Sequence, residues 1–319
     1  MNIEFKISGT SFHIEFKNEE ETIEITDKIN EIKGVLIKSR NKSYKDEIIE
    51  SNWQGMIFKT RYEDENLMPG CFEWLRNWNS APTNIIREIY DLYCQTLKTK
   101  CFEVIRSNFP PINTICRLCK NGNETVHHIL NTCNVLLKST YLKRHNQVLQ
   151  CYILELLTEL KLIKVCPPWY SPVNVKPYYE NEEACLWWDI PEYSGSCDDI
   201  SEEELKRPDG KVMLKKSKQI FLIEMTCPWI DIRDRRYEEK REKYKNIRRN
   251  IKIANPEYDI EQITLVMDSL GGYSKNLVDN VKILIRDRSK VNRIIKKTQK
   301  AMLSQSAHIS KRFKIETLI

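Results

Sequence analysis

The spacing of hydrophobic residues changes several times along the chain. In residues 1–26 the segments "IEFKI", "FHIEF" and "TIEIT" alternate with period two, which predicts short strands. Residues 27–51 are charged and predict a helix, and residues 53–109 follow a helical pattern throughout. The clearest helix begins at Pro82 and Thr83, and "FPPIN" interrupts the pattern afterwards. Its apolar side repeats at three- and four-residue steps, through Ile85, Ile86, Ile89, Leu92, Tyr93 and Leu97.

The second half combines one long helix with alternating strands and helices. A leucine-rich helix is expected from about Val135 to Leu162, followed by the extended, proline-rich "VCPPWYSPVNVKP", the best candidate for a domain boundary. From Ser201 onward, "KVML" and "QIFLIEMT" predict a hairpin joined by "KKSK", and "EQITLVMD" predicts a further buried strand. The last two helices, "SKNLVDNVKILIRDR" and "VNRIIKKTQKAMLSQ", are amphipathic with a basic outer face, suited to following a duplex backbone.

Composition narrows the class of protein. With 319 residues, of which 41% are hydrophobic, the chain can form one large or two to three small domains. No apolar stretch reaches the length of a membrane span and the N-terminus does not resemble a signal peptide, so we expect a nuclear or cytoplasmic protein without a membrane partner.

Charge is distributed unevenly. The net charge is +6, yet residues 177–205 hold ten acidic residues and no Lys or Arg, while from residue 231 onward basic residues outnumber acidic ones by ten. A basic C-terminal third suggests a polyanionic partner such as nucleic acid. The alternative is an ordinary solvated helical surface.

Eleven cysteines, an odd number in a chain of this size, favour reduced thiols with some metal binding over a disulfide framework. Cys116, Cys119, His128 and Cys133 have the spacing C-x2-C-x8-H-x4-C, which predicts a closed tetrahedral zinc site with a structural role. His127 could replace His128, although it has the poorer helical phase relative to Cys133. The competing interpretation is three buried cysteines and a histidine that caps a helix.

The predicted hairpin carries two acids that are expected to converge. Asp209 precedes its first strand and Glu224 lies near the end of its second, among apolar neighbours. Burying a charged carboxylate among apolar neighbours costs free energy unless its charge is neutralised. A Mg2+ or Mn2+ ion bound by both Glu224 and Asp209 would neutralise it. Such an ion can activate water and stabilise charge on a phosphate.

Lys240 is the basic residue expected to join these acids. In the segment "RDRRYEEKREKYKNIRRNI", Lys240 lies close to the middle of the apolar stripe formed by Tyr237, Tyr244, Ile247 and Ile251. A lysine that only extends its ammonium to solvent is the alternative. Arginines spread around the exposed face are assigned to phosphates: Arg233, Arg235, Arg236, Arg241, Arg248 and Arg249. Asp268, at the end of "EQITLVMD", has two interpretations: an acid near the metal site, or an acid that forms the turn after this strand.

The arrangement of Pro208, Asp209 and Glu224 is similar to the motif of PD-(D/E)XK nucleases, except that Thr226 occupies the position of the motif lysine. The order of the motifs resembles the C-terminal part of the open reading frame of non-long-terminal-repeat retrotransposons of the restriction-like-endonuclease class. The specific matches are "CRLC…HHILNTC" and "RPDG…IEMTCPW", supported by "WQGMIFKTRYEDENL", "CFEWLRNW", "YLKRHN", "PPWYSP" and "VMDSLGGYSK".

The resemblance implies an α/β (α+β) chain with a mixed-sheet, restriction-endonuclease-like core, a mainly helical N-terminal region and a small zinc knuckle. It implies Mg2+- or Mn2+-dependent nicking of target DNA that primes reverse transcription, with Asp209, Glu224 and Lys240 as the catalytic residues. Element RNA and a reverse transcriptase acting in trans are further candidate partners. Nucleic-acid contacts are expected at Arg207, Arg235, Arg248 and Arg249.

The expected organisation is a set of five segments. These are an N-terminal region (1–52), a helical region (53–115), the zinc knuckle (116–133), a helical and proline-rich linker (134–200) and the endonuclease domain (201–319). No paired aspartates of a polymerase occur between apolar strands, so no polymerase activity is expected. The alternatives are a non-catalytic nucleic-acid-binding or adaptor module derived from such an element, and an inert relic.

Overall fold

The computed structural model describes residues 2–8, 11–17, 29–51, 53, 55–107, 110–173, 175–188 and 208–318. The chain divides into two compact units, residues 1–59 and residues 60–319. The predicted strand "TIEIT" and Arg207 lie outside the described residues.

The N-terminal unit contains a hairpin and a helix. Strands β1 (Asn2–Ser8) and β2 (Ser11–Lys17) pair antiparallel, with Ile3 opposite Phe16 and Phe5 opposite Ile14, as their period-two alternation predicts. Helix α1 (Ile29–Glu50) follows where the sequence predicts a charged helix, and most of its described side chains are exposed.

The remaining helices have the following bounds. The first group consists of α2 (Met56–Glu63), a 3-10 turn (Pro69–Phe72), α3 (Trp74–Asn77), α4 (Thr83–Tyr93) and α5 (Lys100–Arg106). The middle group consists of π-helical turns at His128–Thr132 and Leu137–Tyr141, α6 (Asn134–Leu136) and α7 (Leu142–Glu159). The last group consists of a 3-10 turn (Ile230–Ile232), α8 (Arg233–Lys243), α9 (Lys245–Ala254), α10 (Lys275–Leu284) and α11 (Arg288–Glu316).

A five-stranded mixed sheet lies at the centre of the second unit. Its order is β3-β4-β5-β6-β7, formed by Tyr178–Glu180, Ala184–Trp188, Gly210–Leu214, Gln219–Thr226 and Asp259–Val266. The first four strands pair antiparallel, whereas β7 runs parallel to β6. The parallel pairing is possible because α8 and α9, which connect these two strands, return the chain to the end of the sheet where β6 begins. The predicted hairpin and third strand are present, and the chain is of the mixed α/β class.

Two of these strands come from the part of the sequence that we expected to be a linker. β3 and β4 precede residue 201, in the acidic and proline-rich region, and extend the sheet beyond β5. The run "ACLWW" in β4 is the signal for a strand, since Ala184, Cys185 and Leu186 are buried. Similarly, α7 lies within the core of this unit.

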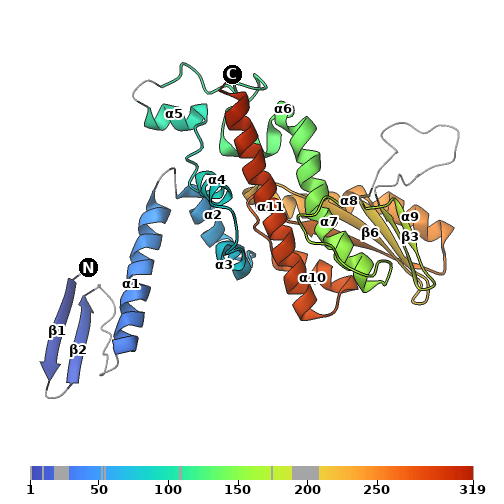
Figure 1. Cartoon of the computed structure of the whole chain (residues 1–319), viewed down its shortest axis with the longest axis horizontal. Helices are drawn as coiled ribbons and strands as arrows, with labels where there is room; N and C mark the ends of the chain where they lie inside the picture. The colour runs from blue at the N-terminus through green and yellow to red at the C-terminus, as the bar shows by residue number, and fades with distance from the viewer. Residues whose placement is uncertain are drawn as a thin grey trace. The chain divides into compact units, whose positions relative to one another are not determined.

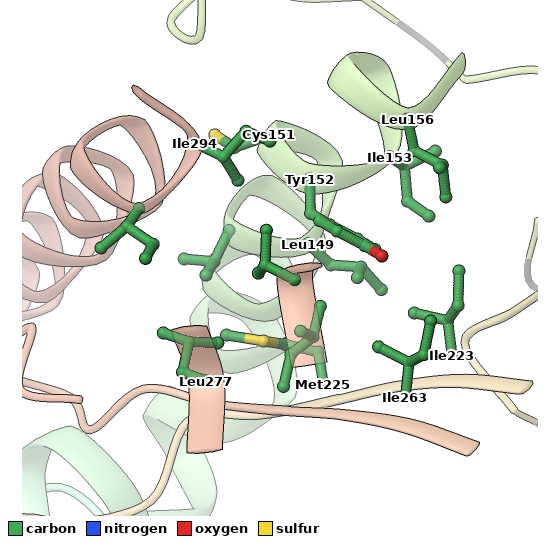
Figure 2. Packing of buried hydrophobic residues seen from close by; sticks show 14 of the residues in the cluster. Leu149, Cys151, Tyr152, Ile153, Leu156, Ile223, Met225, Ile263, Leu277 and Ile294 are labelled. Carbon is green, nitrogen blue, oxygen red and sulfur yellow. The ribbon is translucent and has the colours of Figure 1, made fainter. Parts of the chain in front are cut away.

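The main core is on the face of the sheet covered by α7, α10 and α11 (Figure 1). Alternate residues of β6, Ile223 and Met225, point to this face and meet Tyr152 and Leu149 of α7 (Figure 2). On the opposite face, Leu222 packs with Tyr244, which lies between α8 and α9, and with Ile247 and Ile251 of α9 in a second, smaller cluster. Because side chains in a strand alternate, β6 contributes to both layers.

Helix α11 connects parts of the unit that are distant in sequence. It packs along α7 and α4. Ser310 Oγ donates to Glu88 Oε2 at 2.8 Å, and Lys314 Nζ lies 2.8 Å from the same carboxylate. At the other end, Lys290 pairs with Glu159 at 2.7 Å. The basic outer face predicted for α11 is therefore partly used in ion pairs within the protein.

Asp268 forms the turn after β7 and is completely buried. Its Oδ1 accepts hydrogen bonds from the backbone N–H groups of Leu270 and Gly272, both at 2.9 Å, and from Arg61 at 2.9 Å. Arg233 lies 3.5 Å from its other oxygen and also pairs with Asp64. Of the two alternatives for Asp268, the turn is therefore the one observed. The expectation that Arg233 lies on the exposed face is wrong, because it is 3% exposed and neutralises two acids.

Replacing Asp268 by Asn should lower the free energy of unfolding by about 3–5 kcal/mol, because two buried guanidinium groups would lose their shared counter-charge. Urea denaturation of the protein in buffer that contains zinc measures this. Asp259→Asn is the matched control: its partner Lys252 is 3.5 Å away and the Asp259 side chain is 81% exposed, so we expect a loss below about 1 kcal/mol. Equal effects of the two substitutions would contradict a structural role for Asp268.

Candidate functional site

Four metal-binding side chains converge after α5. The donor atoms of Cys116, Cys119, His128 and Cys133 all lie within 4.8 Å of one another, so they could hold one metal ion. Three sulfur ligands and one imidazole form the tetrahedral donor set that Zn2+ prefers in structural sites. This cluster is called the Cys3His cluster below.

A tight turn brings the first two cysteines together. The backbone N–H of Cys116 donates to Gly122 O, and that of Lys120 donates to Cys116 O, both at 3.0 Å. Gly122 has φ of +72°, and a Cβ there would lie 3.3 Å from His128 Nδ1. Glycine therefore allows both the backbone conformation and the approach of the histidine ring.

The second pair of ligands is held by a π-helical turn. His128–Thr132 closes with a hydrogen bond of 2.8 Å from Cys133 N to His128 O, which spans five residues. A π-helical turn places residues five apart on one side, whereas an α-helix places residues three or four apart there. The x4 spacing between His128 and Cys133 matches this geometry.

The structure distinguishes the two neighbouring histidines. His128 Nε2 lies 3.2 Å from Cys119 Sγ, and its Nδ1 lies 3.1 Å from the hydroxyl of Thr132, which orients the ring. Burial lowers the pKa of His128 and so favours the neutral imidazole that binds metal. His127 instead stacks on Trp229, with ring centroids 5.0 Å apart. His128 is thus the histidine of the cluster.

Two residues close to the cluster ligands, His127 and Asn131, contact the segment that follows β6. Besides the His127–Trp229 stack, Asn131 Nδ2 donates to the carbonyl of Cys227 at 3.0 Å. Cys227 lies three residues after Glu224 in the sequence, so the π-helical turn supports the end of the strand that carries this acid.

Asp209 and Glu224 lie at the same end of neighbouring strands. The antiparallel register pairs Gly210 with Ile223. Asp209, immediately before Gly210, and Glu224, immediately after Ile223, therefore lie side by side. The backbone N–H of Met225 donates to Asp209 Oδ2 at 2.6 Å, which holds the aspartate against β6. The convergence predicted from the hairpin is therefore present in the structure.

Glu224 is a buried carboxylate with one unused oxygen. Its side chain is 3% exposed, Lys240 Nζ contacts its Oε1, and Oε2 has no hydrogen-bond partner among the described residues. Burial raises the pKa of Glu224 and the charge of Asp209 raises it further, while hydrogen bonds from Lys240 and Tyr244 oppose this. An ion with oxygen ligands would satisfy the unused oxygen and relieve the repulsion between the two acids. The residues therefore fit a divalent cation.

Lys240 reaches the acids from α8. The predicted single helix is interrupted at Tyr244, which separates α8 from α9. Tyr244 and Ile247 are buried against the sheet as predicted, and Lys240 points its ammonium toward Glu224. Thr226, which replaces the lysine of the nuclease motif, is buried two residues beyond Glu224.

His145 is a member of this site that we did not predict from the sequence. Its Nε2 lies 3.1 Å from Asp209 Oδ2 and 3.0 Å from the carbonyl oxygen of Met225. Burial lowers the pKa of His145, but the hydrogen bond and charge of Asp209 outweigh burial and raise it to about 9. The two residues are 64 positions apart, and "YLKRHN" carries no local signal that α7 would meet β5.

The arginines assigned to nucleic acid have different environments. Arg235 and Arg249 are exposed, and Arg235 lies 3.3 Å from Glu239 one helical turn further along α8. Arg248 is half-buried and donates to the carbonyl of Arg241 at 3.3 Å. Two of the three described arginines are thus on the surface, where a phosphate backbone could reach them.

No family model matches this chain, and a search of curated proteins finds no match either. In the described part of the chain, no helix has an apolar segment long enough to cross a bilayer.

Zinc content tests the Cys3His cluster. We expect one equivalent of zinc in the purified protein, measured by atomic emission, and a substoichiometric amount in His128→Ala because one of four ligands is lost. His127→Ala is the matched control and should keep one equivalent, since its ring packs on Trp229. Loss of zinc in His127→Ala but not in His128→Ala would show that the assignment is reversed.

Proposed function

We propose that this chain is a metal-dependent DNA endonuclease derived from a retrotransposon, which nicks target DNA to prime reverse transcription by a polymerase acting in trans. The observation that carries the proposal is the group formed by Asp209, Glu224 and Lys240 at one end of β5 and β6. Two convergent acids beside an ammonium are the elements of Mg2+-dependent phosphodiester hydrolysis. The resemblance to the restriction-like-endonuclease class supports the same assignment and supplies the fold family and the DNA substrate.

Each residue has a distinct task in this proposal. Asp209, held through Oδ2 by Met225 N–H, offers Oδ1, and Glu224 offers Oε2. When bound, Mg2+ or Mn2+ would polarise the scissile phosphate and lower the pKa of an attacking water. Lys240, which also contacts Glu224, would help to orient and activate the attacking water. Zinc in the Cys3His cluster would be structural, because four protein ligands leave no open position.

A DNA endonuclease also needs a surface that binds the phosphate backbone, and we assign exposed arginines to it. Arg235 and Arg249 extend from α8 and α9, the helices that follow the strand carrying Glu224. Arg207 precedes Asp209 in the sequence and is assigned to the same role. In this proposal the protein acts in the nucleus, where the DNA target is located.

Nicking of supercoiled plasmid in Mg2+ or Mn2+ tests the proposed activity. Asp209→Asn should abolish nicking, and Lys240→Met should lower its rate by about 10²-fold, since it removes a charged hydrogen-bond donor. Lys245→Met removes an equal charge from an exposed position and should leave the rate nearly unchanged. The proposal fails if the Asp209 variant is as active as the wild type, or if neither protein nicks DNA.

Thermal unfolding in the presence of Mn2+ tests the metal site without activity. Mn2+ should raise the melting temperature of the zinc-loaded wild type, because a ligand that binds only the folded state stabilises it by about 2.7 kcal/mol at a hundredfold excess over Kd. Glu224→Gln should remove most of this increase. Glu183→Gln, on an exposed acid paired with Lys216, is the control. An equal increase in all three proteins would place Mn2+ elsewhere.

A second candidate is a non-catalytic nucleic-acid-binding module, which one observation favours. Lys240 contacts Glu224, and His145 contacts Asp209. Each of the two acids therefore has a counter-charge without a metal. In that case both acids would stabilise the fold, and DNA or RNA binding would survive their replacement. Binding without nicking, retained in the Asp209→Asn variant, would support this function.

A further inference from the structure

A pocket of about 370 Å³ lies beside the candidate carboxylate site, where α8, α9, α10 and β7 meet. Its volume is within the range of roughly 300–1,000 Å³ that small-ligand sites occupy. The residues that matter for its chemistry are Tyr237, Arg241, Arg248, Gln262, Asn280 and Ile283. We refer to it as the Arg248 pocket.

Gln262 presents an unmatched acceptor in this pocket. Its Nε2 donates to the carbonyl oxygen of Lys240 and to Thr264 Oγ1, both at 3.0 Å. Because the carbonyl of Lys240 can only accept, the orientation of the amide is fixed. Gln262 Oε1 therefore points away from these partners, and it is buried without a hydrogen-bond partner in the described residues.

Arg248 presents an unmatched donor. Its Nη2 donates to the carbonyl of Arg241, whereas its Nε is buried and lacks a partner within the described residues. An unpaired buried donor and an unpaired buried acceptor are both costly. Their occurrence on the wall of one pocket indicates a ligand that offers a donor and an acceptor together.

The rest of the lining restricts the chemistry of that ligand. The lining holds two guanidinium groups and two acids, but Asp279 is paired with Lys282 at 3.3 Å and Glu261 is exposed to solvent, so the arginines favour an anionic group. Tyr237 and Ile283 provide an aromatic and an apolar surface, and Arg241 lies 5.7 Å from the centre of the Tyr237 ring. A nucleotide has all of these features, because its phosphate is an anion rich in acceptors and its base is a flat ring that carries N–H donors.

We propose that the Arg248 pocket binds one nucleotide of the nucleic-acid substrate, with its phosphate at the arginines and its base toward Gln262 and Tyr237. The pocket is adjacent to the carboxylate site, because Gln262 bonds to the carbonyl of Lys240, whose ammonium contacts Glu224. A base can enter only when it is unstacked, so the pocket favours single-stranded or locally opened DNA near the cleaved phosphate. This inference rests on the proposed function for the identity of the substrate.

Binding of mononucleotides to the full-length, zinc-loaded chain in buffer without Mg2+ or Mn2+ is the test. Calorimetry with dAMP, dCMP, dGMP and dTMP should detect binding by the wild type. Arg248→Ala should weaken it by about tenfold or more, because a charged hydrogen bond is lost. Lys245→Ala, which removes an equal charge from an exposed position of α9, should have less than about a twofold effect.

A second variant separates loss of the pocket from loss of charge or folding. Ile283→Trp fills the pocket from an exposed position at its rim, where Ile283 is 37% exposed, and leaves both arginines in place. We expect it to abolish nucleotide binding with an unchanged melting temperature. A single-stranded oligonucleotide containing 2-aminopurine should gain fluorescence with the wild type and not with this variant, because the base is unstacked only when the pocket is open.

Other outcomes would overturn the inference. Inorganic phosphate that binds as tightly as any nucleotide would reduce the pocket to an anion site. Equal affinities in the Arg248→Ala and Lys245→Ala variants, or no nucleotide binding at millimolar concentration, would exclude it, as would Ile283→Trp with wild-type affinity. An extended peptide that binds along β7 in place of nucleotides would assign the pocket to a protein partner. Asp209→Asn should still bind nucleotides, so failure of nicking and failure of the pocket are distinguishable.

Discussion

The pairing of β5 with β6 is the constraint on which the rest of the second unit depends. With Gly210 opposite Ile223, β6 directs Ile223 and Met225 to the core beneath α7 and directs Leu222 and Glu224 to the opposite face, which α8 and α9 cover. A shift of one residue would exchange these two sets, placing the acid in the apolar core beneath α7 and removing it from Lys240. The large core on one face therefore fixes where the acid lies on the other.

The two candidate centres share this strand. Two ligands of the Cys3His cluster, His128 and Cys133, flank the π-helical turn. Asn131 of this turn and the preceding His127 contact Cys227 and Trp229, just beyond β6. The same segment is contacted by Arg144 of α7, which is completely buried, donates to Cys227 O at 3.5 Å and lies 5.2 Å from the ring of Tyr141. Burial lowers the pKa of Arg144, so its position costs free energy that the surrounding packing must offset. Metal binding in the cluster would help to hold this costly arrangement in place.

Local patterns in the sequence were sufficient for much of this structure. The short apolar run "QIFLIEMT" predicted β6, the spacing of "CRLC…HHILNTC" predicted the Cys3His cluster, and the helical phase of Lys240 predicted that it points inward. These inferences worked because strand period, helix period and ligand spacing are properties of short segments.

What the sequence did not predict depends on contacts between distant segments. His145 meets Asp209 only because α7 crosses the end of β5, and Arg233 is buried only because Asp64 and Asp268 reach it from two other segments. The strand β4 was missed for a different reason: its apolar run is short and lies between acidic and proline-rich stretches that suggested a connection. Charge counted along the sequence cannot reveal which basic residues are neutralised in the fold.

The position of α11 has a consequence for how the protein is made. This helix, residues 288–316, packs on both α4 and α7, and its Lys314 contacts the buried Glu88 near the beginning of the unit. During synthesis the earlier helices and the sheet would leave the ribosome with this surface uncovered. The unit can reach its final packing only after translation has passed residue 316, and until then the nascent chain exposes apolar surface that a chaperone could bind.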